Sequence, residues 1–70
     1  MNTKQINEAI RAMEFLRKKA GSMAVFLKKV KEDGEIENVS LSDLRYDVGF
    51  WERCVGQIFN DAENYGEDSE

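Results

Sequence analysis

The chain has 70 residues, of which 34% are charged, and a formal net charge of −4 at pH 7. It contains no His, no Pro and one Cys, which excludes a disulfide framework and the common zinc patterns. A chain of this length forms one small domain, and two helices without a disulfide bond or a bound metal ion are only marginally stable. We therefore expect the chain to associate with copies of itself.

The cysteine content and the hydropathy of the chain bear on its location. Cys54 has no second Cys to pair with, which suits a reducing compartment. No segment has the unbroken apolar length of a signal peptide or a membrane span. The sequence thus predicts a cytoplasmic protein without membrane contact.

Residues 3–31 are predicted to form the first helix, capped by Asn2 or Thr3. Gly21 and Ser22 could split it, since a glycine often ends a helix and a serine often caps the next. The unbroken spacing of its apolar residues, alternately three and four, favours one helix, straight or kinked there. This first apolar series consists of Ile6, Ala9, Met13, Leu16, Ala20, Met23, Leu27 and Val30.

Residues 32–40 are predicted to form the loop. Asp33-Gly34 ends the first helix, and Ser40 caps the second, with Asp43 three residues later.

An αββα fold is the alternative. It treats residues 23–30 and 36–41 as strands, because Asp-Gly is a strong hairpin-turn signal. The two segments alternate poorly between apolar and polar residues, so helical spacing fits them better.

Residues 41–63 are predicted to form the second helix. In an antiparallel hairpin each apolar residue lies opposite a member of the first series, with position numbers that sum to 71, so that Ala20 faces Trp51. This second apolar series is Leu41, Leu44, Val48, Trp51, Val55, Ile58 and Ala62. Residues 1–63 thus predict a single all-α domain, an antiparallel helical hairpin with a coiled-coil-like seam that assembles into a homo-oligomeric bundle. Residues 64–70 are acidic and interrupted by glycine, and are expected to be a disordered tail.

Charge divides the chain into two opposite halves. Residues 1–31 carry a formal +6 and residues 32–70 a formal −10. In the hairpin the basic end of the first helix would run beside the acidic start of the second, which favours this orientation. The acidic half would repel duplex DNA, so we expect no binding to it.

Four aromatic residues project from the sides of the predicted seam: Phe15, Phe26, Tyr46 and Phe50. A single hairpin cannot cover them, so we interpret them as an interface. Gly49 and Gly56, one heptad apart, suggest a close helix contact, or substitution without consequence at exposed positions.

The sequence offers one set of candidate anion contacts. Lys4, Arg11, Lys18 and Lys29 fall in one narrow band of the first helix, and Arg53 is a further cation on the second. Cations interleaved with aromatic residues can hold phosphates and stack bases. The alternative is an ordinary solvated helix face.

The sequence shows no residue pattern that is typical of an enzyme active site. General acid–base and nucleophilic catalysis need His, a Cys beside a base, or paired carboxylates in a cleft. Cys54 follows Phe50 and precedes Ile58 by one turn each, which is typical of an inert packed thiol. We expect no enzyme, no catalytic residue, no metal site and no cofactor.

The segment Gly49-Phe50-Trp51-Glu52-Arg53 resembles a Gly-Phe-hydrophobic stretch in the second helix of small helical hairpins from bacterial viruses. Those proteins are oligomeric sponges that bind cyclic nucleotides. The resemblance covers five residues and implies, as one alternative, a sponge that sequesters a small nucleotide.

The leading expectation is a non-enzymatic interaction protein of phage or mobile-element type. It would bind, and in doing so inhibit, a protein partner. A third alternative, a transcription-related regulator, lacks a helix-turn-helix motif.

Overall fold

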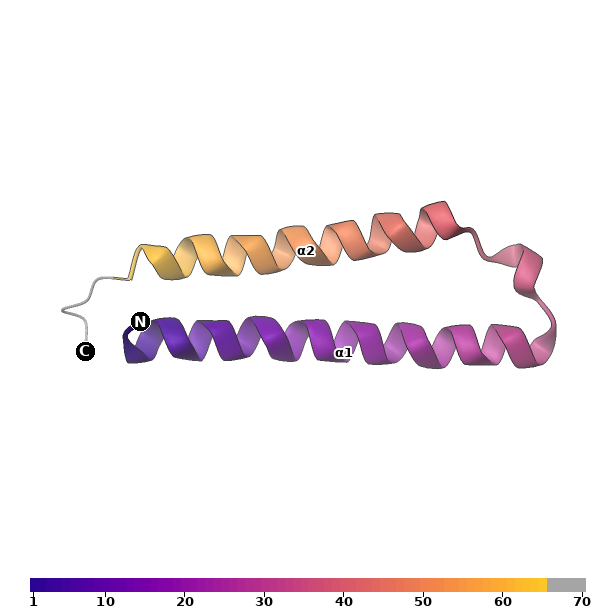
Figure 1. Ribbon diagram of the computed structural model, residues 1–70, viewed down its shortest axis with the longest axis horizontal. Coiled ribbons are helices and arrows are strands. Elements are labelled where there is room, and N and C mark those ends of the chain that lie inside the picture. The colour runs from indigo at the N-terminus through magenta and orange to yellow at the C-terminus, as the bar shows by residue number, and fades with distance from the viewer. Residues whose placement is uncertain (66–70) are drawn as a thin grey trace.

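A computed structural model of the chain describes residues 1–65. It consists of α1 (Thr3–Asp33), a single 3-10 turn η1 (Ile36–Asn38) and α2 (Leu41–Glu63), with α1 and α2 antiparallel and side by side (Figure 1). No strand occurs within residues 1–65, so the predicted all-α hairpin is confirmed and the αββα alternative is wrong. Residues 66–70 of the predicted tail lie outside the described residues.

Two side chains at the start of α1 hold the open end of the hairpin together. The Asn2 side chain caps α1 by accepting a hydrogen bond from the Gln5 N–H at 2.8 Å, and the Gln5 side chain accepts one from the Asn2 N–H at 3.1 Å. Gln5 Nε2 also donates to the Ala62 carbonyl at 3.2 Å, and Asn2 Nδ2 donates to the Tyr65 carbonyl at 3.4 Å. Tyr65, which the sequence assigned to the tail, is half-buried and belongs to this contact.

α1 is one continuous helix that passes through Gly21 and Ser22 without a break. It ends at Gly34, as predicted, and this glycine has the left-handed φ of 74°. The N–H groups of Gly34 and Glu35 donate to carbonyls of the last turn at 3.3 and 3.1 Å, which is the Schellman arrangement.

Ser40 caps α2, also as predicted. Its hydroxyl accepts hydrogen bonds from the N–H groups of Ser42 at 3.1 Å and Asp43 at 3.4 Å. Both ends of the connecting segment are therefore fixed by local chemistry.

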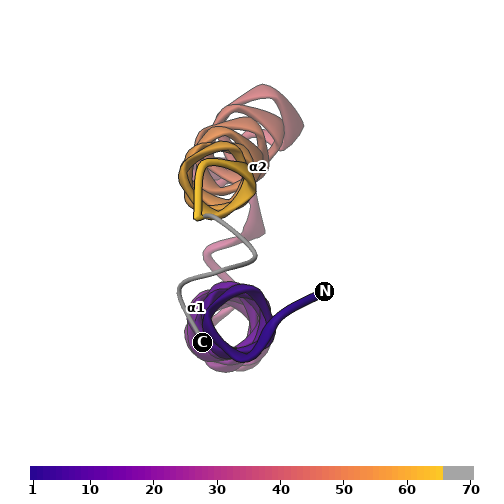
Figure 2. The same ribbon diagram turned by 90° about the vertical axis from the view of Figure 1, so that its left-hand side faces the viewer.

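The hairpin is a single layer with almost no core. The Cα atoms span 55 × 18 × 9 Å, and their radius of gyration is 16.5 Å, against about 11 Å for a compact chain of this length. Among the described residues only Ala12 (0% exposed) and Ala62 (5%) are buried hydrophobic residues. The two helices lie closest at the open end and diverge toward the loop (Figures 1 and 2). The small side chains of Ala12 and Ala62 thus permit the two helices to approach closely.

The residues of each helix that face the other helix are not all those that the sequence predicted. Ile6, Met13 and Ala20 are exposed instead of buried, and so are Leu41 and Val48. The physical reason is that a 3.5-residue repeat drifts by about 20° per heptad on a straight helix of 3.6 residues per turn. The predicted pairs at these positions therefore rotate out of the contact, and Ala12 takes the central place.

Candidate interaction surfaces

One side of the hairpin carries three of the four predicted interface aromatic residues, and the fourth, Tyr46, lies at its outer edge on α2. A hollow between the helices is lined by Phe15 from α1 and by Cys54 and Ile58 from α2, with polar residues at its rim; these are Arg11, Glu14, Lys18, Gln57 and Asp61. Phe50 precedes Cys54 by about one turn, and Phe26 follows Phe15 by about three; Tyr46 precedes Arg53 by about two turns and so lies farther round α2. We call this side, with Phe15, Phe26 and Phe50 and with Tyr46 at its outer edge, the aromatic face.

The aromatic face is largely open to solvent. Phe15 is half-buried, and its ring lies 5.7 Å from Lys19 Nζ, a cation–π distance. Phe26 and Phe50 are each 51% exposed and Tyr46 is 70% exposed. Three of the four rings thus have most or half of their surface uncovered within one chain.

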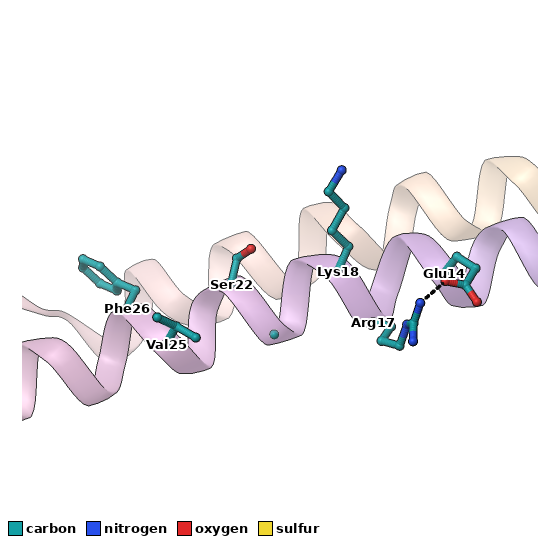
Figure 3. Close-up of a pocket in the computed structure, with 7 residues that line it drawn as sticks. Glu14, Arg17, Lys18, Ser22, Val25 and Phe26 are labelled. Carbon is teal, nitrogen blue, oxygen red and sulfur yellow. Dashed lines mark hydrogen bonds and ion pairs between the residues drawn. The ribbon is translucent and has the colours of Figure 1, made fainter.

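A second hollow lies on the flank of α1 alone (Figure 3). Its lining changes from charged to apolar along the helix: Glu14, Arg17, Lys18, Gly21, Ser22, Val25 and Phe26. Figure 3 shows Arg17 turned back to its ion-pair partner Glu14, whereas Lys18 and Ser22 point to the opposite side of the ribbon. Since one helix supplies every lining residue, this hollow is a shallow depression and no enclosed ligand site.

The five candidate anion contacts do not converge within one hairpin. Lys4 and Lys29 stand about 37 Å apart along α1, at 1.5 Å per residue, and Arg53 lies on the side of α2 turned away from α1. Arg11 pairs with Glu8 at 3.1 Å, Lys29 with Asp33 at 3.9 Å, and Lys4 also has an interaction partner. Lys18 borders both hollows and forms no ion pair with the described residues.

The ion pairs between described residues lie within α1 and do not join the two helices. Every ion pair within residues 1–65 joins residues three or four positions apart on α1. The opposite charges of the two halves therefore act over distance, and on α2 Asp61 accepts a hydrogen bond from Gln57 at 3.0 Å.

A second apolar surface escaped the sequence analysis. A hollow at the loop end is lined by Lys31 of α1 and Leu41 of α2, together with Leu27, Val30, Ile36 and Val39. Met13 lies five full turns before Lys31 on α1, and Phe59 lies five full turns after Leu41 on α2. Residues separated by whole turns project from the same side of a helix, so Met13 and Phe59 share the side of this hollow. Met13 and Phe59 therefore lie on one side of the hairpin, opposite the aromatic face.

This surface extends along α2 and over the first turns of α1. Its exposed members are Ile6, Ile10 and Met13 of α1 and Leu41, Val48 and Phe59 of α2, and we call them the aliphatic face. The signal was present in the sequence, because Ile10 is four residues after Ile6 and three before Met13. Assignment of these positions to the seam concealed it.

Gly49 and Gly56 make no close contact within one chain. A Cβ atom added to either would meet nothing within 4 Å. The predicted tight helix contact at these glycines is therefore absent from the hairpin itself.

Neither metal ligands nor a membrane span is found in the part that the structure describes. Residues 1–65 contain no cluster of three or more His, Cys, Asp or Glu side chains placed to bind a metal ion, and neither helix is long and apolar enough to cross a membrane. Comparison with protein families, curated proteins and solved structures gave no significant match to this chain. A function must therefore be argued from the two faces themselves.

Proposed function

We propose that the protein is a non-enzymatic interaction protein that binds a helical segment of another protein on its aromatic face. One observation carries this proposal: the hairpin buries only two alanines among its hydrophobic residues, while twelve large apolar side chains within residues 1–65 remain at least 39% exposed. Exposed apolar patches of this extent on small proteins mark interaction sites.

The shape and chemistry of the aromatic face favour a helix as the occupant. Phe15, Cys54 and Ile58 form an apolar floor between two antiparallel helices, the geometry into which an amphipathic helix lays its apolar stripe. The rim on α1 has a net positive charge, because Arg11 and Lys18 outnumber Glu14, and the rim on α2 is acidic at Asp61. Rims of opposite sign would orient a partner helix that carries acidic residues on one edge and basic residues on the other.

Site-specific photo-crosslinking in the source cells tests the proposal. A photoreactive residue at Phe15 or Phe26 should form a covalent adduct with one and the same protein, and a photoreactive residue at Glu63, on the opposite side of α2, should form none with that protein. The substitution Phe50→Glu should abolish the Phe26 adduct, because it buries a charge in the contact. Adducts of Phe15 or Phe26 with the chain itself, or equal labelling of the same protein from Glu63, would contradict the proposal.

A nucleotide sponge is the second candidate, favoured by Lys18, which borders two hollows that each contain a phenylalanine. A ligand present at 100 times its dissociation constant would stabilise the protein by about 2.7 kcal/mol. A thermal-shift series with cyclic di- and trinucleotides, with Lys18→Ala as control, separates the two candidates. A shift that disappears in the variant would favour the sponge, and no shift would remove it.

A further inference from the structure

We propose that the aliphatic face binds a second copy of this chain, to give a twofold-symmetric four-helix bundle in which α1 of each hairpin packs against α2 of the other. This inference concerns the side opposite the aromatic face and does not rest on the proposed function.

The exposed area indicates that one hairpin is an incomplete folding unit. The chain exposes 5733 Å², whereas a compact folded monomer of 8.1 kDa exposes about 4,500 Å². A standard interface removes about 800 Å² from each partner, which would bring the exposed area per chain toward that value. A second layer on the aliphatic face would also give Met13, Val48 and Phe59 the core that the single layer lacks.

Continuity makes the aliphatic face the side that a second copy covers. Its exposed apolar residues lie on α2 from Phe59 near the open end to Leu41 at the loop, and on α1 from Ile6 to Met13. On a straight helix such a stripe on each of two neighbours is the pattern of a bundle core. The aromatic face, in contrast, carries charged residues around its central hollow, as the outer surface of a bundle does.

Charge complementarity selects the orientation of the two copies. Two hairpins can pair face to face in two ways. In the first arrangement, α1 lies over the partner's α2 and both loops are at the same end. In the second, α1 lies over the partner's α1 and the loops are at opposite ends. Residues 3–33 carry a formal +4 and residues 41–63 a formal −3, so only the first arrangement places opposite charges side by side. Arg17, one turn after Met13, and Glu52, one turn after Val48, are placed at the edges of this contact.

Sedimentation analysis of matched variants tests the choice of face. The wild-type chain should be a dimer at micromolar concentration, Met13→Glu and Val48→Glu should abolish the dimer, and Phe50→Glu on the aromatic face should leave it intact. A monomeric wild type, a dimer that survives both face substitutions, or a dimer lost in Phe50→Glu would overturn the proposal.

The distance between the loops of the two copies tests their orientation. This measurement leaves the aliphatic face unchanged, so it gives a result even if the charged variants fail to fold. A spin label at Glu35→Cys in a Cys54→Ser background marks the loop of each copy. Loops at one end should give a distance well under half of the 55 Å length of the hairpin. A distance close to the full length would overturn the proposed arrangement.

Discussion

Replacing Gly21 and Gly34 by alanine should change the stability of the hairpin in opposite directions. Gly21 lies inside α1, and a Cβ atom built on it meets nothing within 4 Å. The substitution Gly21→Ala therefore brings the helix-propensity difference between Gly and Ala, a gain of about 0.8–1.0 kcal/mol in the free energy of unfolding.

Gly34 has equally open surroundings but a φ of 74°. The substitution Gly34→Ala forces an L-residue into the left-handed region, which costs about 1–2 kcal/mol. The two variants should therefore differ by about 2–3 kcal/mol, although each adds the same methyl group.

Urea unfolding followed by circular dichroism at 222 nm measures both changes. All variants must be compared at one protein concentration, because association contributes to the apparent stability. For a chain of this size about 1 kcal/mol corresponds to a shift of about 4–8 °C in Tm. A loss of stability in Gly21→Ala, or no loss in Gly34→Ala, would refute the reasoning.

Three further substitutions test the closest contact and the caps. Ala12→Leu should destabilise the hairpin by about 1–3 kcal/mol, because the added carbons enter a fully closed contact; a neutral result would place Ala12 outside it. Ser40→Ala should cost about 1 kcal/mol through the lost cap of α2, measurable by thermal melting. Gln5→Ala should cost about 1 kcal/mol and accelerate amide exchange at the end of α2, since Gln5 binds the Ala62 carbonyl; unchanged exchange there would contradict this role.

The sequence located the helix ends because their signals are local. The Asn2 cap, the Gly34 stop and the Ser40 cap each depend on a few adjacent residues whose chemistry satisfies the terminal backbone groups. The same holds for the aromatic face, since the angles between its residues follow from the helical repeat alone.

The rotation of the two helices against each other could not be derived in the same way. On a straight helix, residues spaced by seven shift by about 20° around the axis with each heptad. The apolar pattern alone therefore does not say whether Met13 and Val48 face the other helix or the outer surface. The small size of Ala12, which permits the tight approach, carried that information. Once Met13 and Val48 were assigned to the seam, the aliphatic face could not be recognised.

The candidate anion contacts show a different limit. A helical wheel places Lys4 and Lys29 in one band because it discards the distance along the axis. The straight helix separates them by about 37 Å, so a shared angle does not make a shared site.

The central claim is that this hairpin completes its fold only when another molecule covers its exposed apolar faces. The most direct test is the thermal unfolding of the purified protein over a hundredfold range of concentration. We expect Tm to rise with concentration, because unfolding then includes dissociation of the copies. A cooperative transition at one Tm throughout this range would contradict it, since the single layer with two buried alanines would then be stable by itself.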